Sequence, residues 1–308
     1  MLMRVSMPAF SPKPTRSYNV RSISFPARSH PNISRIEEQL NKLSSCEASS
    51  LNAERICARL SGLGEIYRCI EDLLNLPLTQ QALAQNQEEK WIADMLDYLI
   101  RYLDLCSNTR DGVLLMKESV RELQSALRRS KGGGESSIEG NVNDYIFCRK
   151  KIKREAEKSL ASLKQKDSSS LLNANDHYPS AILKALREAS WMTISIFSSL
   201  LLFLCVPVLK PKRSKWSLLS KLVHKGAVAC EGQHENMNEL ENVDLVLATL
   251  LGNKASRDLE SEKIEAAQKM LEILEISIEE IENELECLFR HLIHTRVSLL
   301  NILSHQLE

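Results

Sequence analysis

Residues 263–308 read KIEAAQKMLEILEISIEEIENELECLFRHLIHTRVSLLNILSHQLE, with apolar side chains at alternating intervals of three and four residues. These positions are Ile264, Ala267, Leu271, Leu274, Ile278, Ile281, Leu285, Leu288, Leu292, Thr295, Leu299 and Ile302, and only Thr295 among them is not apolar. A heptad seam of this length predicts one long helix with a continuous apolar edge. That edge needs a partner, either in the same chain or in a second one.

The residues beside the seam favour a partner within the same chain. A two-stranded coiled coil places mostly charged residues there, whereas here Met270, Phe289 and Leu303 stand among the charges. Toward the C-terminus, Ile293 and Val297 make further faces of the helix apolar. A stripe that widens in this way predicts packing in a bundle formed by the chain itself. An intermolecular coiled coil is the alternative.

Composition indicates helices rather than strands. The chain has 308 residues, of which 43% are hydrophobic, and contains only ten glycines, nine prolines and few aromatic residues. A chain of this length can bury a sizeable core. The sequence therefore predicts an all-α fold, an elongated multi-helix bundle with a long C-terminal heptad-patterned helix and a disordered N-terminal tail.

The chain divides into a tail and one helical domain. Residues 1–33 contain five prolines among serines and arginines, have no acidic residue and show no period, which is typical of a disordered basic tail. Ser34 and Glu37 form a capping box that predicts the start of the first helix. The bundle domain then covers residues 34–308, with flexible breaks predicted near 131–137, 167–178 and 226–236.

Within this domain, the pattern predicts several further helices and their ends. Gly62 and Gly64 interrupt the second helical pattern, which must stop before Pro77. Separate helices are expected at 91–105, 113–127, 138–166 and 240–251. The basic run 149–154 is predicted to be a solvated helix face, and the glutamates of the C-terminal helix are its natural intramolecular complement.

Residues 189–209 form the most apolar segment and carry no charge over 21 residues. A helix of this length would just cross a bilayer, and the basic residues that follow resemble an interface anchor. However, five serines and threonines dilute the segment and Pro207 shortens its helical part. We therefore predict a buried central helix, with a membrane-spanning helix as the alternative.

The sharpest short motif lies in the tail. Arg21 precedes Ser24 by three residues, with Ser22 between them and Pro26 two residues after the serine. A basophilic kinase recognises such an arginine, and the spacing resembles the phosphoserine motif that 14-3-3 proteins bind. An Arg- and Ser-rich, acid-free N-terminus is also typical of organelle transit peptides, so import into plastids or mitochondria is the competing interpretation.

The remaining reactive residues do not form a recognisable site. The eight cysteines are scattered without a C-x-x-C pair, which predicts free thiols in a reducing compartment. His291 and His294 are three residues apart, but no further ligand at fitting spacing completes a metal site. The sequence contains no phosphate loop, nucleotide fingerprint or nucleophile elbow. We expect no enzymatic activity, cofactor, metal, nucleic acid or small-molecule substrate.

Four stretches resemble a known family: YNVRSISFPARSHP (residues 18–31), LQSALRR (123–129), FCRKK (147–151) and RVSLLN (296–301). They are similar to the plant-specific BYPASS-related proteins of unknown function, and the similarity covers nearly the whole chain. The resemblance implies a helical land-plant protein associated with root and shoot development. It carries over no catalytic or binding residue.

Together these features predict a non-enzymatic regulatory or scaffolding protein that faces the cytosol and binds protein partners. Phosphorylation of Ser24 in the basic tail would recruit a reader, while the bundle holds a separate partner. The alternative function is a membrane-associated protein anchored by a helix at 189–209. A plastid location through N-terminal transit is the alternative to the cytosol.

Overall fold

The computed structural model describes residues 31–45, 51–85, 89–131, 138–166, 181–206, 237–252 and 257–304. These residues form α1 (Pro31–Ser45), α2 (Ala53–Leu74), α3 (Pro77–Gln85), α4 (Glu89–Lys131), α5 (Ile138–Lys166), α6 (Ala181–Leu204), α8 (Glu239–Leu251) and α9 (Arg257–Ser304). The described residues contain no strand, and the predicted all-α bundle is confirmed. The chain divides into two units at His30 and Pro31, and all eight of these helices belong to the second unit.

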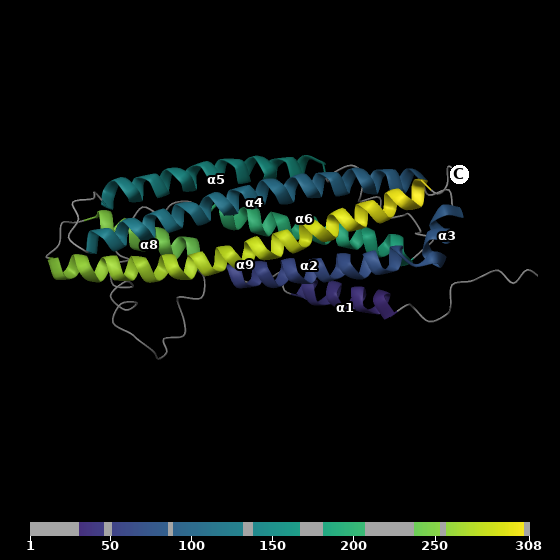
Figure 1. Cartoon of the computed structure of the whole chain (residues 1–308), viewed down its shortest axis with the longest axis horizontal. Helices are drawn as coiled ribbons and strands as arrows, with labels where there is room; N and C mark the ends of the chain where they lie inside the picture. Colours follow the sequence, from purple (N-terminus) through teal and green to yellow (C-terminus); the bar gives the residue numbers. More distant parts are fainter. Residues whose placement is uncertain are drawn as a thin grey trace, which may run out of the picture. The chain divides into compact units, whose positions relative to one another are not determined.

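Helix α9 is the element against which the largest part of the bundle packs. It spans 48 residues and lies along α4, α2 and α8 (Figure 1). Every position of the predicted seam is buried, including Thr295. The helix begins at Arg257, six residues before the expected start at Lys263. Because the seam is covered by helices of the same chain, the predicted intramolecular packing is confirmed.

The neighbours of α9 run in opposite directions. Asn75 near the end of α2 accepts a hydrogen bond from Ser298 near the end of α9, at 3.2 Å, so these two helices are parallel. Arg110 and Arg121 of α4 instead contact α9 in reverse order, at Glu286 and Glu275, so α4 is antiparallel to α9.

The prediction of two helices at 91–105 and 113–127 was wrong, because both belong to the single helix α4. Cys106, Thr109 and Val113 recur at intervals of three and four and are all buried, so they continue the apolar face across the segment between the two predicted helices. The Thr109 hydroxyl donates a hydrogen bond to the Leu105 carbonyl at 2.7 Å and is thereby satisfied inside the helix.

The glycines of α2 likewise do not interrupt the helix, contrary to the prediction. A Cβ atom at Gly62 would lie 3.0 Å from Cδ2 of Leu43, so the missing side chain lets α1 and α2 approach each other closely. The predicted stop before Pro77 is confirmed, since α2 ends at Leu74 and α3 begins at Pro77.

Helix α1 begins at Pro31 rather than at the capping box of Ser34, so that predicted start was wrong by three residues. Proline fits the first turn of a helix because its missing N–H has no partner to lose there. The predicted breaks near 131–137, 167–178 and 226–236 lie wholly or almost wholly outside the described residues, as does most of the tail 1–33.

Helix α6 contains the apolar part of the segment 189–209 and packs against α2, α5 and α1. It is buried along one broad side, which confirms the predicted buried helix. No helix in the described part of the chain has both the length and the apolar character needed to cross a membrane.

The hydroxyl groups that dilute this segment bond to neighbouring helices. Three side chains of α2 and α4 reach them: Tyr67 contacts Thr193 at 2.9 Å, Tyr102 donates to Ser190 at 3.1 Å, and Arg59 donates to Ser195 and Ser199 at 3.0 and 2.9 Å. A buried hydroxyl is costly unless it is hydrogen-bonded. These hydroxyls therefore fix the position of α6 between its neighbours.

The prediction that the glutamates of α9 pair with the basic run 149–154 was wrong. They form ion pairs with bases of α4 instead. The contacts are Arg110 to Glu286 at 2.7 Å, Lys117 to Glu282 and Glu279 at 2.9 and 3.0 Å, and Arg121 to Glu275 and Glu279 at 2.6 and 2.8 Å. The three bases of α4 follow one side of that helix, and the antiparallel glutamates of α9 lie opposite them. We call these contacts the α4–α9 ion-pair row.

Arg149, the first residue of the basic run, is not a solvated side chain. It is only 1% exposed and donates to Asp244 of α8 at 3.1 Å. It also donates to the carbonyl oxygens of Leu204 and Val206 at the end of α6, at 3.5 and 3.3 Å. One cation thus joins α5, α6 and α8. The next two bases, Lys150 and Lys151, are exposed, as the solvated-face prediction requires.

Replacing Arg149 by methionine should destabilise the protein by about 3–5 kcal/mol, because it leaves the buried Asp244 carboxylate without its counter-charge. Urea unfolding at neutral pH, followed by circular dichroism, measures the change. The double variant Arg149→Met, Asp244→Leu removes both charges and should recover most of the loss. A single variant as stable as the unmodified protein would show that this ion pair does not hold the three helices.

The α4–α9 ion-pair row predicts acid sensitivity. The hydrogen bond from Lys117 lowers the pKa of Glu279 below its ordinary value, so the folded state favours the ionised carboxylate. Its contribution to the free energy of unfolding is therefore fully present above the unfolded pKa of about 4.3 and is lost as the pH falls through the lower folded pKa.

The Lys117→Met variant should show a shallower decrease in stability over that range. Arg128→Met removes the same charge from α4 without an ion pair to α9, and serves as the control. Urea unfolding measured at several pH values gives both slopes. Equal slopes for the two variants would contradict the assignment of this acid sensitivity to the ion-pair row.

Candidate functional site

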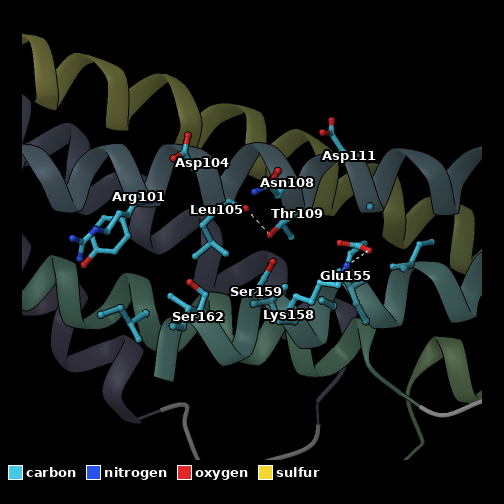
Figure 2. Close-up of a pocket in the computed structure, with 18 of the residues that line it drawn as sticks. Arg101, Asp104, Leu105, Asn108, Thr109, Asp111, Glu155, Lys158, Ser159 and Ser162 are labelled. Carbon is cyan, nitrogen blue, oxygen red and sulfur yellow. Dashed lines mark hydrogen bonds and ion pairs between the residues drawn. The ribbon is translucent and has the colours of Figure 1, made fainter. Parts of the chain in front are cut away.

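A groove of about 770 Å³ lies between α4, α5 and α6 (Figure 2). Its volume is in the range of sites that bury most of a ligand. The inner surface is apolar and is contributed by all three helices: Leu105 and Leu115 of α4, Ile152, Ala156 and Leu163 of α5, and Ile194, Leu201 and Leu204 of α6. Small residues of the lining, Gly112, Ala156 and Ser159, leave the space open.

The rim of the groove is polar on both sides. Helix α4 contributes Arg101, Asp104, Asn108 and Asp111, and α5 contributes Lys151, Glu155, Lys158, Ser159 and Ser162. Figure 2 shows Thr109 and Ser159 between the two helices, whereas Asp104 and Asp111 extend from α4 away from α5. Acidic groups thus prevail on the side of α4 that faces away from α5, and two lysines line the α5 rim.

One end of the groove is held by aromatic side chains. The Tyr98 and Tyr102 rings stack with their centroids 6.4 Å apart, and the Arg101 guanidinium lies over the Tyr98 ring at 5.5 Å. Tyr102 is itself fixed by its hydrogen bond to Ser190 of α6. The end wall is therefore anchored to the core, while Arg101 presents an exposed cation at the rim.

The charged groups of the groove are exposed at its rim. Lys158 and Glu155 form an exposed ion pair of 2.8 Å, and the hydrogen bond from Lys158 lowers the pKa of Glu155. Asp104 and Asp111 are also exposed to solvent. The lowered pKa of Glu155 favours the charged form of its carboxylate.

The residues singled out in the tail, Arg21, Ser22, Ser24 and Pro26, lie outside the described residues. The histidine pair of α9 has a partner on α2 instead of further metal ligands. Nδ1 of His294 lies 3.0 Å from Glu71, and Nδ1 of His291 lies 3.6 Å from the same carboxylate. No cluster of three or more metal-ligating side chains occurs in the described part of the chain.

Six of the eight cysteines are described, and all six are free thiols. Burial raises the pKa of the Cys106 thiol to about 12, and its Sγ donates to the carbonyl of Leu285 across the α4–α9 contact. A thiol with so high a pKa is unreactive at neutral pH. Cys106 therefore acts as a small core residue.

The groove was not predicted from the sequence. The residues that could have signalled it are Gly112 on α4 and the small residues Ala156 and Ser159 on α5. None of these residues indicates a cavity without knowledge that α4 and α5 lie side by side. The pairing of these two helices depends on tertiary contacts.

Fold and groove together define a class of protein, an all-helical bundle with an apolar surface groove among three of its helices. Residues 59–302 match the family described as Protein BPS1, a match that runs from α2 to α9. The chain belongs to this family, which agrees with the BYPASS-related resemblance of its sequence motifs. The membership supports a role in plant development. No curated protein and no solved structure matches the chain.

Proposed function

We propose that this chain is a non-enzymatic regulatory or scaffolding protein of plant root and shoot development that holds a helix of a protein partner in the α4–α5 groove. The observation that carries the proposal is the groove itself, with an apolar inner surface and a charged rim. Amphipathic helices bind in hydrophobic grooves of this kind through side chains at intervals of three and four. Membership of the BPS1 family supports the developmental role.

The charges on the rim specify the partner further. Lys151 on α5 favours an acidic residue on the side of the bound helix that faces it, whereas Lys158 is already paired with Glu155. Asp104 and Asp111 on α4 favour basic residues on its opposite side. The partner is therefore a helix with an apolar stripe, flanked by acidic residues on one side and basic residues on the other.

The tail supplies a second interaction. Phosphorylation of Ser24 would place a doubly charged group three residues after Arg21, in the spacing that 14-3-3 proteins bind. A protein with a helix-binding groove and a switchable tail can bring two partners together in the cytosol. This arrangement supports a scaffolding role.

Filling the groove should abolish the developmental function. Ser159→Trp places a large side chain in the groove, while the half-exposed position of Ser159 leaves the core beneath it undisturbed. Plants that lack the endogenous protein and show a root or shoot defect should be rescued by the unmodified chain but not by this variant. Normal root and shoot growth with Ser159→Trp would overturn the groove as the functional site.

Ser261→Trp adds the same side chain at an exposed position of α9, remote from the groove, and should rescue growth fully. Thermal unfolding of both purified variants shows whether each is folded. A photo-crosslinking amino acid at Ser162 identifies what the groove holds. A protein adduct that maps to an amphipathic helix supports the proposal, whereas a small-molecule adduct contradicts it.

Substitution of Ser24 by alanine should abolish recovery of 14-3-3 proteins, because it removes the phosphate acceptor. A pull-down from plant cells that express either form measures the difference, and phosphatase treatment of the unmodified chain should have the same effect. Ser22→Ala, which keeps Arg21 and Ser24, is the matched control. Equal recovery of 14-3-3 proteins by Ser24→Ala and the unmodified chain contradicts this part of the proposal.

A further inference from the structure

Exposed apolar side chains gather on one side of α9. Five of the thirteen large hydrophobic residues that are exposed in the described part of the chain belong to this helix: Ile273, Ile276, Ile293, Val297 and Leu300. Isolated exposed apolar residues need no explanation, but a repeated group on one helix side does. We call the side that carries these five residues the outer face of α9.

The five residues form two clusters on the same helix side. Ile276 and Val297 are separated by 21 residues, which is three heptads, so they occupy equivalent positions. The seam on the other side of the helix is buried against α2, α4 and α8 (Figure 1). The outer face is therefore an apolar surface that the described helices of the chain do not cover.

We propose that the outer face of α9 binds the same face of a second copy of this chain, with the two helices antiparallel. When Ile276 of one copy lies opposite Val297 of the other, Ile273 lies opposite Leu300. Ile273 and Ile276 of each copy then meet Leu300 and Val297 of the other, while Ile293 lies opposite Glu280. The twofold axis passes near Cys287, midway between the clusters.

Charge decides the direction of the two helices. Glu280 and Arg290 stand on the outer face between the clusters, and both are exposed. Within the described residues, neither makes an ion pair with another side chain; the Nε of Arg290 donates only to the carbonyl of Glu286 at 3.4 Å. A parallel dimer would bring Arg290 beside Arg290 and Glu280 beside Glu280, which is unfavourable.

In the antiparallel register, opposite charges of the two copies come close to each other. Arg290 of one copy comes opposite Asn283 of the other, one helical turn from Glu280, within reach of its carboxylate. Two equivalent ion pairs then form near the axis, flanked on both sides by apolar contacts. Within one chain, these residues are ten positions apart, or about 15 Å along the helix, so they cannot pair with each other.

Sedimentation equilibrium of the full chain over a range of concentrations tests this proposal. The unmodified chain should form dimers as its concentration rises, without larger assemblies, because a twofold interface is closed. Arg290→Glu should weaken dimerisation at least about tenfold, since it places like charges opposite each other. A chain that stays monomeric at every concentration overturns the proposal.

The double variant Glu280→Arg, Arg290→Glu decides the register. It reverses both charges, so the antiparallel pairs reform and the dimer should recover to near its original strength. In a parallel dimer, Arg290→Glu would only exchange one pair of like charges for another, so the single variant would not weaken binding. If Arg290→Glu acted through the fold, the second substitution would not restore binding. Lack of recovery therefore overturns the proposed arrangement.

Two further variants distinguish the loss of this interface from the effect of adding a charge elsewhere on the surface. Val297→Glu introduces a charge into an apolar cluster and should abolish the dimer, while Leu78→Glu introduces one at an exposed apolar residue of α3 and should leave it unchanged. Equal effects of the two substitutions would contradict the assignment to α9. Ser159→Trp should not affect dimerisation, so this interface and the groove are tested independently.

Discussion

The apolar seam of α9 must be covered along its whole length, and the rest of the bundle depends on this constraint. A helix of 48 residues cannot bury one side against a single short neighbour, so α2, α4 and α8 each cover part of it. The parallel α2 and the antiparallel α4 lie on it together, and α4 carries the bases that match its glutamates. Burial of the seam stabilises the bundle, because removal of apolar area from water is the dominant favourable contribution to folding.

Polar interactions then determine how the remaining helices are placed. Apolar contacts have little directional preference, whereas a buried hydrogen bond or ion pair is satisfied in one arrangement only. The hydroxyls of α6 meet Tyr67, Tyr102 and Arg59, and Arg149 meets Asp244 together with the end of α6. Each group would be costly to bury without its partner, so these contacts discriminate against other packings of the same helices.

The placement of the helices leaves two apolar surfaces with different character. The groove is concave, lies among α4, α5 and α6, and has a rim of mixed charge that suits a helical partner. The outer face of α9 is exposed and carries charges that, in the proposed antiparallel dimer, are complementary to those of a second copy. The two surfaces involve different residues, so a dimer could hold two partner helices at once. Such an arrangement would fit the scaffolding role that we propose for this chain.

The sequence by itself determined the helical class, the buried seam of α9, the bounds of α5 and the stop before Pro77, because these follow from local periodicity and from proline sterics. It did not determine the continuity of α4, the partner of Arg149, the pairing of the α9 glutamates or the groove. Those features depend on which helices lie side by side. Two charges far apart in the sequence give no local signal of their contact, and a cavity exists only once three helices enclose it, so only the tertiary structure decided them.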